Sequence, residues 1–465
     1  MLDFRSFIKL LEDSGQVDHI SKEVDRRHEL SGIMSKIDMN RRAFRFDNVR
    51  GASFPVVGGL YNSLERFGLA LGADEPENFG HADFDARIEA AKAASIAPVT
   101  VTTGPCKENK LGGDQIDLSA LPVPSFFELD SGAFITGAIG ITRDPDSGEL
   151  NVGIYRTLIT GKNTCVINAS SLSDLRRIYA SWEKRGETMP IAIALGVAPA
   201  MLVAGSCKLP PNACEYDVAG GLAGEAMQLV QCEDSDLLVP ADAEIVIEGT
   251  VDFSQRVENL LGEFAGQYGP ENAPVTTVNT ITHRNDAIYY GITAGRHPEH
   301  NTLGNVAVYG VQRSISASIR AAVPEVKDIE VLFEPSMGTL AHVTISIGKK
   351  SDDQPQDIIK RAFAAGGHIF PVSKITKRII IVDDDIDVHD RVDVNWAIWN
   401  RAAAASKFMV IPDVESWELE RAAKAGLKSA RIGIDATMDL EDVEKLVRPI
   451  IPGADKLRLE DYIDD

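Results

Sequence analysis

Amphipathic helical segments alternate with short apolar runs over the first 110 residues. Apolar positions recur at helical spacing in Phe4–Glu12, His28–Met39 and Asn62–Leu71, and the Ala, Glu and Lys residues of "DARIEAAKAA" favour a further helix. Between them lie runs such as "FPVVGGL", which have the length of short strands. We therefore expect a small N-terminal α/β domain over residues 1–110.

The pattern changes to β over residues 111–300. Two strands are expected at "GAFITGAIGITRD" and "LNVGIYRTLITG". They are joined by "DPDSG", a strong turn signal. Further strands are expected at "MPIAIALGV" and "AEIVIEGTV" and within "TTVNTITHRNDAIYYGIT", and one helix, "SLSDLRRIYASWEKRG", interrupts them from a Ser cap. So many strands without a regular alternation of strand and helix indicate a barrel-like domain.

A long helix over residues 301–323 ends before Pro324 and leads to a third region. There, "AHVTISIG", "PQDIIKRAFAAG" and "KRIIIVDDDIDV" form a β-α-β succession, which recurs weakly at "SARIGIDATM" followed by "DLEDVEKLVRPII". We expect residues 324–465 to form a C-terminal α/β domain with a mixed sheet and helices on one or both faces. The whole chain is thus an α/β protein of the α+β multidomain kind.

Composition narrows the class of protein. The chain of 465 residues is too long for one compact core, and 44% hydrophobic with 25% charged residues is ordinary for a soluble globular protein. A net charge of −22 argues against nucleic acid as a partner but leaves room for a local basic pocket. Five scattered cysteines without a CxxC pair fit reduced thiols. The N-terminus has the pattern of a charged amphipathic helix, and no apolar run reaches membrane-spanning length, so we expect a cytoplasmic protein.

Two carboxylates lie five positions apart in the apolar stretch "VENLLGEFAGQYGP". In an α-helix Glu258 and Glu263 would point about 140° apart, and in a strand they would face opposite sides. Only an irregular turn at Gly262 would bring them together. Taken alone, the stretch is more simply interpreted as two solvated acids at the end of an element.

Other polar residues occur where chemistry is possible, each with a plain structural alternative. Asn151 and Arg156 lie five apart on an expected strand, where an exposed arginine near the strand end is the plainer interpretation. Asp174 lies near the start of a helix, where an acid interacts favourably with the helix dipole. Glu215 lies in a loop rich in Pro and Gly, where most acids are simply solvated.

Two clusters complete the set of candidates. "VDDDIDV" ends an apolar strand with four acids, which is either a cation site or a solvated strand end. "AGRHPEHNTLG" gathers Arg296, His297 and His300, although histidines in loops usually bind no metal. The chain has no GxGxxG after a strand, no GxxxxGK[ST], no HExxH and no GxSxG. Nucleotide-fold, P-loop, zincin and serine-hydrolase functions therefore lose their main support.

Taken together and in this order, these features resemble the UbiD family of decarboxylases, which use prenylated flavin mononucleotide (prFMN). The resemblance covers nearly the whole chain. It rests on the Asn-x4-Arg of "NVGIYR", the "MPIAIALGVAPA" strand, the "CEYDVAGGLAGE" loop, "LLVPADAEIVIEGTV", the Glu-x4-Glu of "ENLLGEFAGQY" and the "IIIVDDDIDV" strand. It implies a flavin-binding split β-barrel over residues 111–300, and a C-terminal domain that assembles the chain into a homodimer or homohexamer.

The resemblance further implies a metal ion, typically Mn²⁺, that bridges to the flavin phosphate and is held by an asparagine, a histidine and a glutamate. Asn151 and Glu215 fall on two of these places, and Asp174, eight residues before Trp182, takes the place of the histidine. A carboxylate is a hard oxygen ligand that suits Mn²⁺ or Mg²⁺. The family also places a K⁺ ion nearby on backbone carbonyls, here matched by the loop Gly205–Ser206–Cys207.

Further positions of this chain match residues that contact the cofactor in the family. Gly153, Ile154 and Ser173 correspond to positions that line the flavin, and Cys207 belongs to the K⁺ loop. Lys377, just before the "IIIVDDDIDV" strand, is the best match for a lysine that contacts the cofactor.

The family's catalytic trio, an arginine and two glutamates, maps onto Arg156, Glu258 and Glu263. Between the two acids the family usually has Gly-Pro-Phe-Gly, whereas this chain has Asn-Leu-Leu-Gly, so the spacing and Gly262 are kept while the path of the loop is changed. The resemblance implies a carboxy-lyase that catalyses reversible, non-oxidative decarboxylation through a covalent adduct of the substrate with prFMN, which is the electron sink.

A proton donor is needed for the carbon that loses CO₂. A carboxyl group in an apolar pocket has a raised pKa and donates a proton near neutral pH. Glu263, flanked by Leu261 and Phe264, is expected in this role, with Arg156 paired to Glu258 to orient it.

The substrate is expected to be a small aromatic or heteroaromatic carboxylic acid, with an α,β-unsaturated acid as a further class. Arg296, His297 and His300 are the candidates for contacting its polar or ionised end. A flavin prenyltransferase is implied as supplier of the cofactor. Two alternatives are a split-barrel flavin reductase that uses ordinary FMN and a catalytically inactive assembly homologue. Retention of Arg156, Glu258 and Glu263 argues against the inactive homologue.

Overall fold

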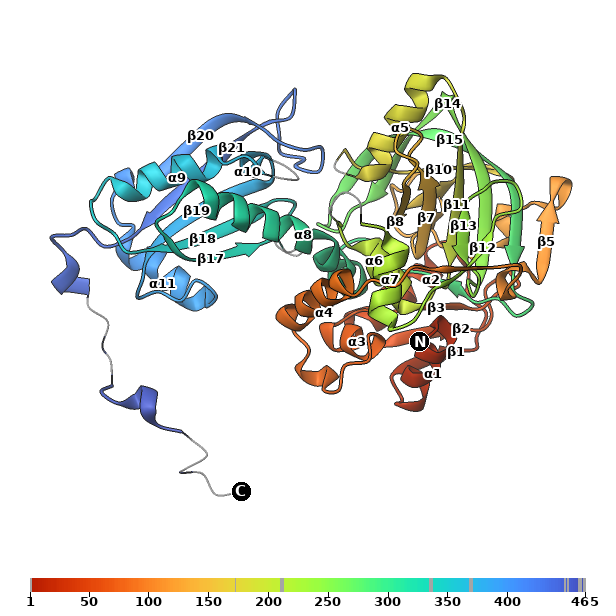
Figure 1. Cartoon of the computed structure of the whole chain (residues 1–465), viewed down its shortest axis with the longest axis horizontal. Coiled ribbons are helices and arrows are strands. Elements are labelled where there is room, and N and C mark those ends of the chain that lie inside the picture. Colours follow the sequence, from red (N-terminus) through yellow and green to blue (C-terminus); the bar gives the residue numbers. More distant parts are fainter. Residues whose placement is uncertain are drawn as a thin grey trace. The chain divides into compact units, whose positions relative to one another are not determined.

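The computed structural model describes residues 2–171, 173–209, 213–333, 338–367, 371–446, 449, 451–458 and 462. The chain divides into two compact units (Figure 1). The first unit comprises Met1–Gln312 and two later segments, Phe333–Thr339 and Trp417–Arg421. The second unit comprises Arg313–Leu332, Leu340–Ser416 and Ala422–Asp465.

A nine-stranded antiparallel sheet dominates the first unit (Figure 1). Its strands follow the order β6-β9-β10-β15-β14-β11-β7-β8, with β5 paired to β15. Two residues separate β6 from β7, and only Tyr155 and Arg156 separate β8 from β9, although each pair lies toward opposite ends of the order. The sheet therefore curls until its ends approach each other, which confirms the expected split barrel. The strands are β5 (Asn109–Gly112), β6 (Phe134–Ile135), β7 (Ala138–Arg143), β8 (Leu150–Ile154), β9 (Thr157–Ile159), β10 (Thr164–Ile167), β11 (Met189–Leu195), β14 (Ile245–Gly262) and β15 (Tyr268–His283).

The hairpin of β14 and β15 is the longest feature of this sheet. The two strands pair without interruption from Arg256 opposite Pro274 to Gly262 opposite Tyr268. An irregular turn at Gly262 was one way to unite the two acids of "ENLLGE", but the strand remains regular through Gly262. The chain turns only afterwards, over residues 263–267.

The N-terminal residues form a four-stranded sheet in the order β1-β2-β3-β16. Its last strand, β16 (Tyr289–Tyr290), comes from the region expected to belong to the barrel. Phe4 and Phe7 also share a hydrophobic core with Ile139 and Met201. The packing therefore shows no domain boundary at residue 110, because the N-terminal region and the barrel share both a sheet and a core. The remaining elements here are β1 (Val17–Ile20), β2 (Ala43–Phe46), β3 (Val56–Gly58), α1 (Phe4–Asp13), α2 (Glu29–Met39), α3 (Leu64–Ala70) and α4 (His81–Ala93).

Three helices flank the barrel and a small sheet extends it. The helices are α5 (Asp174–Arg185), α6 (Pro199–Ser206) and α7 (Glu215–Ala223), and the small sheet contains β4 (Val99–Val101), β12 (Gln228–Gln231) and β13 (Leu238–Pro240). Helix α5 has Ser173 as its N-cap and ends at Gly186, which adopts a left-handed conformation with φ of 69°.

The long helix α8 (Pro298–Ala322) begins three residues before its expected start. Glu299 in its first turn is fully buried and accepts hydrogen bonds from the backbone N–H groups of Gly59 and Leu60, at 2.7 and 2.8 Å. The hydroxyl of Tyr290 donates to the same carboxyl group at 2.9 Å. These bonds fix the start of α8 against the N-terminal sheet.

The second unit is built on a five-stranded mixed sheet in the order β17-β18-β19-β21-β20. Ile380 and Val382 pack with Ile434 and α11 in one core cluster, whereas Gly433, on the opposite face, lies against Ile359 of α9. Helices thus cover both faces, as expected from the sequence (Figure 1). The elements are β17 (Val326–Leu332), β18 (Ala341–Ile347), α9 (Gln354–Ala364), α10 (Val372–Ile375), β19 (Thr376–Asp383), α11 (Arg391–Arg401), β20 (Phe408–Glu415) and β21 (Lys428–Ala436).

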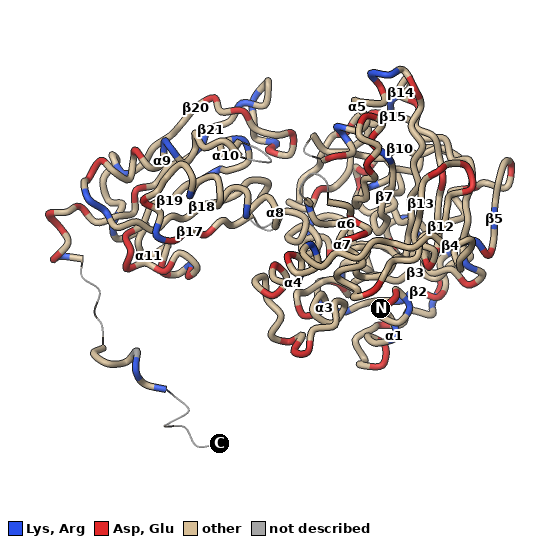
Figure 2. The backbone as a smooth tube through the Cα atoms, in the orientation of Figure 1, with Lys and Arg blue, Asp and Glu red and all other residues tan. Residues whose placement is uncertain are grey.

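The expected helix of "DLEDVEKLVRPII" is reduced to a 3₁₀ turn at Val443–Leu446, and residues 447, 448 and 450 lie outside the described part. Lys and Arg residues alternate with Asp and Glu residues along both units (Figure 2). Among the described helices, none has the length and apolar character to cross a membrane.

Candidate active site

Arg156 and Glu263 form an ion pair where the β8–β9 connection meets the turn after β14. Arg156 lies in the two-residue connection between β8 and β9, and Glu263 follows the last residue of β14. Nη2 of Arg156 donates to Oε1 of Glu263 at 2.8 Å, and the glutamate side chain is only 1% exposed. Nη1 of Arg156 and Oε2 of Glu263 are buried and have no partner among the described residues. The pair therefore keeps one donor and one acceptor for a bound molecule.

Gly269 makes room for the Glu263 side chain. A Cβ atom at Gly269 would lie 2.8 Å from Oε1 and 2.9 Å from Cγ of Glu263. Gly269 pairs with Leu261 in the β14–β15 ladder, so the glutamate lies against the backbone of the neighbouring strand. Any larger residue at position 269 would displace the carboxyl group.

Glu258 does not pair with Arg156 as expected. The partner of Arg156 is Glu263 instead. Glu258 is an exposed residue of β14, opposite the exposed Asn272. No hydrogen bond or ion pair joins its side chain to another described residue. The physical reason is the regular strand, because side chains an odd number of positions apart point to opposite faces.

The cluster of Arg296, His297 and His300 is only partly brought to this site. The rings of His300 and Phe264, the residue after Glu263, are 6.3 Å apart. Burial, together with the charge of Arg156, lowers the pKa of His300 to about 3, so the imidazole is neutral. Its Nδ1–H donates to the carbonyl of Gly295 at 3.0 Å, which leaves Nε2 as an acceptor.

His297 is tied to the fold rather than offered to a substrate. Its Nδ1–H donates to the carbonyl of Ala294 at 2.6 Å, and its Nε2 accepts from the Ser35 hydroxyl at 2.7 Å. Arg296 is exposed, and its side chain lies beside Gly266 in the turn after β14. His300 is therefore the member of this cluster that contacts the residue after Glu263 and is affected by the charge of Arg156.

A further acid, Glu271, belongs to the same surroundings and is absent from the sequence-based set. Its side chain is 7% exposed and accepts from Nη2 of Arg176 at 3.2 Å. Burial raises the pKa of Glu271 to about 7, while Arg176 and Arg156 lower it and Glu418 and Glu263 raise it. The sequence offered one signal for Glu271: it is an acid shortly after the expected turn, and in a β-hairpin such an acid can face the same side as Glu263.

The residues expected to hold a metal ion come together at the other end of the same strand. Asp174 and Glu215 are the first residues of α5 and α7, and Asn151 lies on β8. Lys208 donates from Nζ to Oδ2 of Asp174. The N-termini of α5 and α7 and the Lys208 ammonium group lie at the same cluster as the two carboxylates and the Asn151 amide. Helix N-termini favour anions, and carboxylate and amide oxygens favour cations, so the cluster suits an anion bound together with a cation.

The donor set fits a divalent metal ion. Oε2 of Glu215 is buried without a partner among the described residues. Burial is the main cause that raises the pKa of Glu215 to about 7; the charge of Asp174 contributes to the rise and that of Lys208 opposes it. Nδ2 of Asn151 donates to the Tyr155 hydroxyl at 3.0 Å, so its oxygen is left for another ligand. Groups of three or more His, Cys, Asp or Glu do not occur as candidate metal sites in the described residues; this set has two acids and one amide.

Tyr155 covers the glycine expected to line the flavin. Gly140 and Gly153 are direct partners in the β7–β8 ladder, and a Cβ atom at either would meet the Tyr155 side chain, at 2.8 and 2.5 Å. Ile154 is half-buried at the end of β8. Ser173 caps α5, where its hydroxyl accepts from the Arg176 N–H at 3.3 Å.

The remaining cofactor candidates occupy two different units. Gly205–Ser206–Cys207 form the end of α6 in the first unit, where the last carbonyls of a helix lack helical partners. Lys377 lies on β19 in the second unit and donates to the Ser429 hydroxyl at 3.0 Å and the Ala430 carbonyl at 2.9 Å. Its contact with a cofactor stays a prediction.

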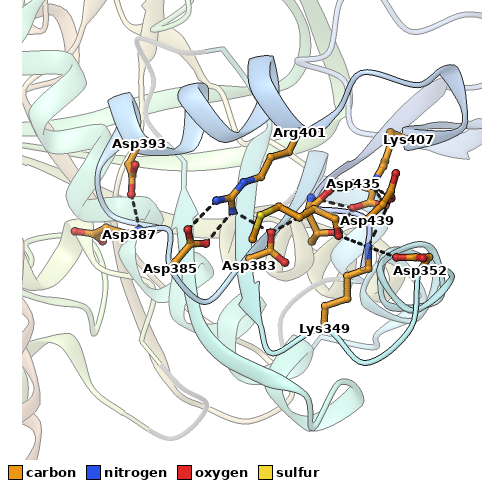
Figure 3. Close-up of polar contacts among 12 residues, drawn as sticks. Lys349, Asp352, Asp383, Asp385, Asp387, Asp393, Arg401, Lys407, Asp435 and Asp439 are labelled. Atoms are coloured by element: carbon orange, nitrogen blue, oxygen red, sulfur yellow. Dashed lines mark hydrogen bonds and ion pairs between the residues drawn. The ribbon is translucent and has the colours of Figure 1, made fainter. Parts of the chain in front are cut away.

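Asp383 and Asp385 of "VDDDIDV" belong to an ion-pair network at the end of β19 (Figure 3). Arg401 is fully buried and donates to Asp383 at 2.9 Å and to both oxygens of Asp385, at 2.8 and 2.7 Å. Lys407 lies 3.3 Å from the neighbouring Asp435. Because Asp383 and Asp385 already have a cationic partner, the geometry favours a structural role for them over a cation site.

Family models match the chain in three consecutive parts. They are the N-terminal domain (residues 8–82), the Rift-related domain (98–297) and the C-terminal domain (308–436) of 3-octaprenyl-4-hydroxybenzoate carboxy-lyase, UbiD. A protein of Archaeoglobus fulgidus is 31% identical over 462 residues, which cover 95% of this chain and 92% of the relative.

Solved structures resemble the whole chain. The UbiD-class enzyme HmfF from Pelotomaculum thermopropionicum, in complex with FMN, is 32% identical with a TM-score of 0.79, covering 99% of this chain and 100% of the other. An evolved dimeric form of the same enzyme, in complex with prFMN, is 31% identical with a TM-score of 0.76, covering 100% of both chains. The matched domains, in this order and over almost the full length, establish that the chain belongs to the UbiD family.

Proposed function

We propose that this protein is a prFMN-dependent carboxy-lyase that catalyses reversible, non-oxidative decarboxylation of an aromatic or heteroaromatic carboxylic acid. Family membership and the FMN and prFMN complexes of HmfF support the class of reaction. The proposal is carried by one observation: strand β8 and the two-residue connection after it contribute to both parts of the site. Asn151 belongs to the oxygen-rich cluster at two helix N-termini, and Arg156, five residues later, holds the buried Glu263.

The cluster at the starts of α5 and α7 would hold the phosphate of the cofactor through a divalent metal ion. Asn151, Asp174 and Glu215 would be the ligands, and hard oxygen donors suit Mn²⁺ or Mg²⁺. Ile154 and Ser173 would line the flavin, as would Gly153 if the Tyr155 side chain that covers it moves aside, with Cys207 and the end of α6 near a K⁺ ion. When bound, prFMN would supply the electron sink that makes loss of CO₂ from an sp² carbon feasible.

Glu263 would hold the proton that replaces CO₂ on the substrate. Decarboxylation breaks one C–C bond and leaves an electron pair on carbon, which must receive a proton. The buried Oε2 of Glu263 has no partner among the described residues and is the atom that would carry that proton. Arg156 would fix the carboxyl group through Oε1, so the donor is oriented before the substrate arrives.

His300 would contribute to the choice of substrate. A neutral imidazole whose Nδ1–H is engaged offers Nε2 only as an acceptor. This favours a ring that carries an N–H or O–H donor, such as a pyrrole- or indole-type acid. Arg296 would meet an ionised group, and His297 would act by supporting the loop.

Co-production with a flavin prenyltransferase tests the proposal. The bound cofactor would be identified by mass and absorption spectrum, and aromatic and heteroaromatic acids would be screened for CO₂ release, with protein made without the prenyltransferase as control. We expect release only from the co-produced protein. An ordinary flavin spectrum with reduction by NAD(P)H and no CO₂ release would instead support the flavin reductase. Absence of any bound flavin would support an inactive assembly homologue. Assembly as a homodimer or homohexamer and the contact of Lys377 remain predictions.

A further inference from the structure

The side chain of Tyr155 folds back along strand β8 and reaches the side chain of Asn151. Asn151, Gly153 and Tyr155 occupy alternate positions, and alternate positions of an extended chain point to one face. Because Gly153 has no side chain, the tyrosine can cover it, and a Cβ atom there would lie 2.5 Å from the Tyr155 hydroxyl oxygen. That oxygen accepts from Nδ2 of Asn151 at 3.0 Å.

A second glycine makes room for the tyrosine ring on the neighbouring strand. Gly140 of β7 is the direct partner of Gly153 in the ladder, and a Cβ atom at Gly140 would lie 2.8 Å from Cδ2 of Tyr155. Directly opposite residues share a face of the sheet, so the two glycines together leave one space, which the ring fills. The position of the hydroxyl is therefore set by packing on the backbone as well as by its bond to Asn151.

The same hydroxyl lies beside the other proposed metal ligands. Burial is the main cause that raises the pKa of Tyr155, and the charges of Asp174 and Glu215 contribute to the rise. Hydrogen bonds from the Asn151 side chain and from the backbone N–H of Leu175, the residue after Asp174, oppose it. The Tyr155 hydroxyl therefore adjoins all three side chains that would hold the metal ion and the first turn of α5.

We propose that Tyr155 is a positioning residue for the metal ion, because its hydroxyl holds the Asn151 amide with Oδ1 turned toward the ion. This inference rests on the metal site of the proposed function. An amide side chain presents either its oxygen or its NH₂ group, and only the oxygen binds a hard cation. When the oxygen faces the ion, the NH₂ group points the other way, and as part of a buried side chain it needs an acceptor there. The Tyr155 hydroxyl is that acceptor.

Titration of Mn²⁺ into metal-free protein in the presence of saturating FMN tests this role. Binding is followed by calorimetry, and free Mn²⁺ by its electron paramagnetic resonance signal. In Tyr155→Phe the ring still fills the space over the glycines but the hydroxyl is absent, and we expect Mn²⁺ to bind about tenfold more weakly. Tyr179→Phe is the matched control, because Tyr179 is a buried tyrosine whose hydroxyl donates to the Ile167 carbonyl, at 3.2 Å. It should leave the Mn²⁺ affinity within about twofold of the wild type.

A double-mutant cycle with Asn151→Ala shows whether the effect passes through the amide. Asn151→Ala alone should weaken Mn²⁺ binding, because it removes one ligand. Adding Tyr155→Phe should then change the affinity no further, because no amide is left to orient. An unchanged affinity in Tyr155→Phe, or an equal loss in the Asn151→Ala background, overturns the inference. Should Tyr155→Phe not fold, Gly140→Ala decides, since its added methyl group displaces the ring and should weaken Mn²⁺ binding; an unchanged affinity overturns the inference there too.

The outcomes separate this inference from the proposed function. Release of CO₂ by the co-produced wild type tests the function and involves no change at Tyr155. If the wild type releases CO₂ and binds Mn²⁺, but Tyr155→Phe binds Mn²⁺ equally well, only the inference fails. If no acid releases CO₂ while Tyr155→Phe weakens Mn²⁺ binding, the function fails and the role of Tyr155 in the metal site stands. If the wild type binds no Mn²⁺ in the presence of FMN, the metal site and the inference fail together.

Discussion

Arg156 and Glu263 are 107 residues apart in sequence, yet Nη2 of the arginine lies 2.8 Å from Oε1 of the glutamate. The contact exists because the curled sheet brings the β8–β9 connection to the tip of the β14–β15 hairpin. Each partner keeps one buried polar atom without a partner among the described residues. An oriented and incompletely satisfied pair of this kind leaves polar atoms available to a bound substrate.

Replacing the proposed proton donor should abolish the reaction. Glu263→Gln keeps the size of the side chain and a hydrogen bond to Arg156 but cannot deliver a proton. We expect CO₂ release to fall at least about a hundredfold, while the cofactor remains bound with an unchanged spectrum. Glu77→Gln, an exposed acid outside the candidate site, is the matched control and should stay within about twofold of the wild type. Turnover near the wild-type rate in Glu263→Gln would remove the role of Glu263.

A methyl group at Gly269 should move the donor without unfolding the protein. The added Cβ would lie 2.8 Å from the end of a flexible side chain, which can shift. We expect Gly269→Ala to remain folded and to lose about a hundredfold in kcat, because small displacements of a catalytic group are costly. Gly112→Ala is the control, since nothing lies within 4 Å of its added Cβ. Equal activities of the two variants would contradict the packing of Glu263 on Gly269.

Removing the Lys208 ammonium should strengthen metal binding. Lys208 donates to Asp174, which is one of the proposed ligands, so an incoming cation has to displace it. We expect Lys208→Met to bind Mn²⁺ about tenfold more tightly than the wild type, measured by calorimetry on metal-free protein. Lys110→Met, which loses an ion pair to Glu233 outside this cluster, is the control. Unchanged Mn²⁺ affinity in Lys208→Met would argue against Asp174 as a ligand.

The buried Glu271 should make stability depend on pH in a defined direction. The pKa of Glu271 is raised from 4.5 to about 7, so the folded state binds its proton more tightly than the unfolded state does. The stability that this bound proton contributes is lost as pH rises through the window from about 4.5 to about 7. Glu271→Gln has no such titration. Relative to the wild type, the variant should therefore gain up to about 3 kcal/mol in unfolding free energy between acid and mildly alkaline pH. Urea unfolding of both proteins across the window measures this; a constant or opposite difference would contradict the raised pKa.

The buried ion pairs of the second unit should matter more than exposed ones. Arg401→Met leaves Asp383 and Asp385 without their main cation, and we expect a loss of about 3 to 5 kcal/mol in the unfolding free energy of that unit. Lys445→Met breaks an exposed pair with Asp442 and should leave stability almost unchanged, because solvent screens the pair. Denaturant unfolding of both variants checks the contrast. Similar losses in the two would mean that the network in Figure 3 is solvated.

Local patterns were sufficient for most elements. Apolar spacing located α1 and α2 to within a residue, and the Ser cap located the start of α5. The turn signal in "DPDSG" separated β7 from β8. Such signals are local in sequence, because helical and strand periodicity, caps and turns depend on residues a few positions apart.

The candidate site was predicted less completely. Asn151, Asp174 and Glu215 were named from a resemblance and do meet, but Lys208 among them was not expected. His297 looked like a substrate contact, although both of its ring nitrogens are engaged within the fold, one of them by Ser35. Contacts of this kind join segments that no local pattern relates.

The sequence by itself determined that Glu258 and Glu263, an odd number of positions apart, would face opposite ways in any regular strand. Only the tertiary structure decided that the strand is regular there, that Glu263 is the one turned inward and that Glu271 lies beside it. The reason is physical: periodicity assigns side chains to faces within one element, whereas strand pairing and the curl of the sheet decide which faces meet.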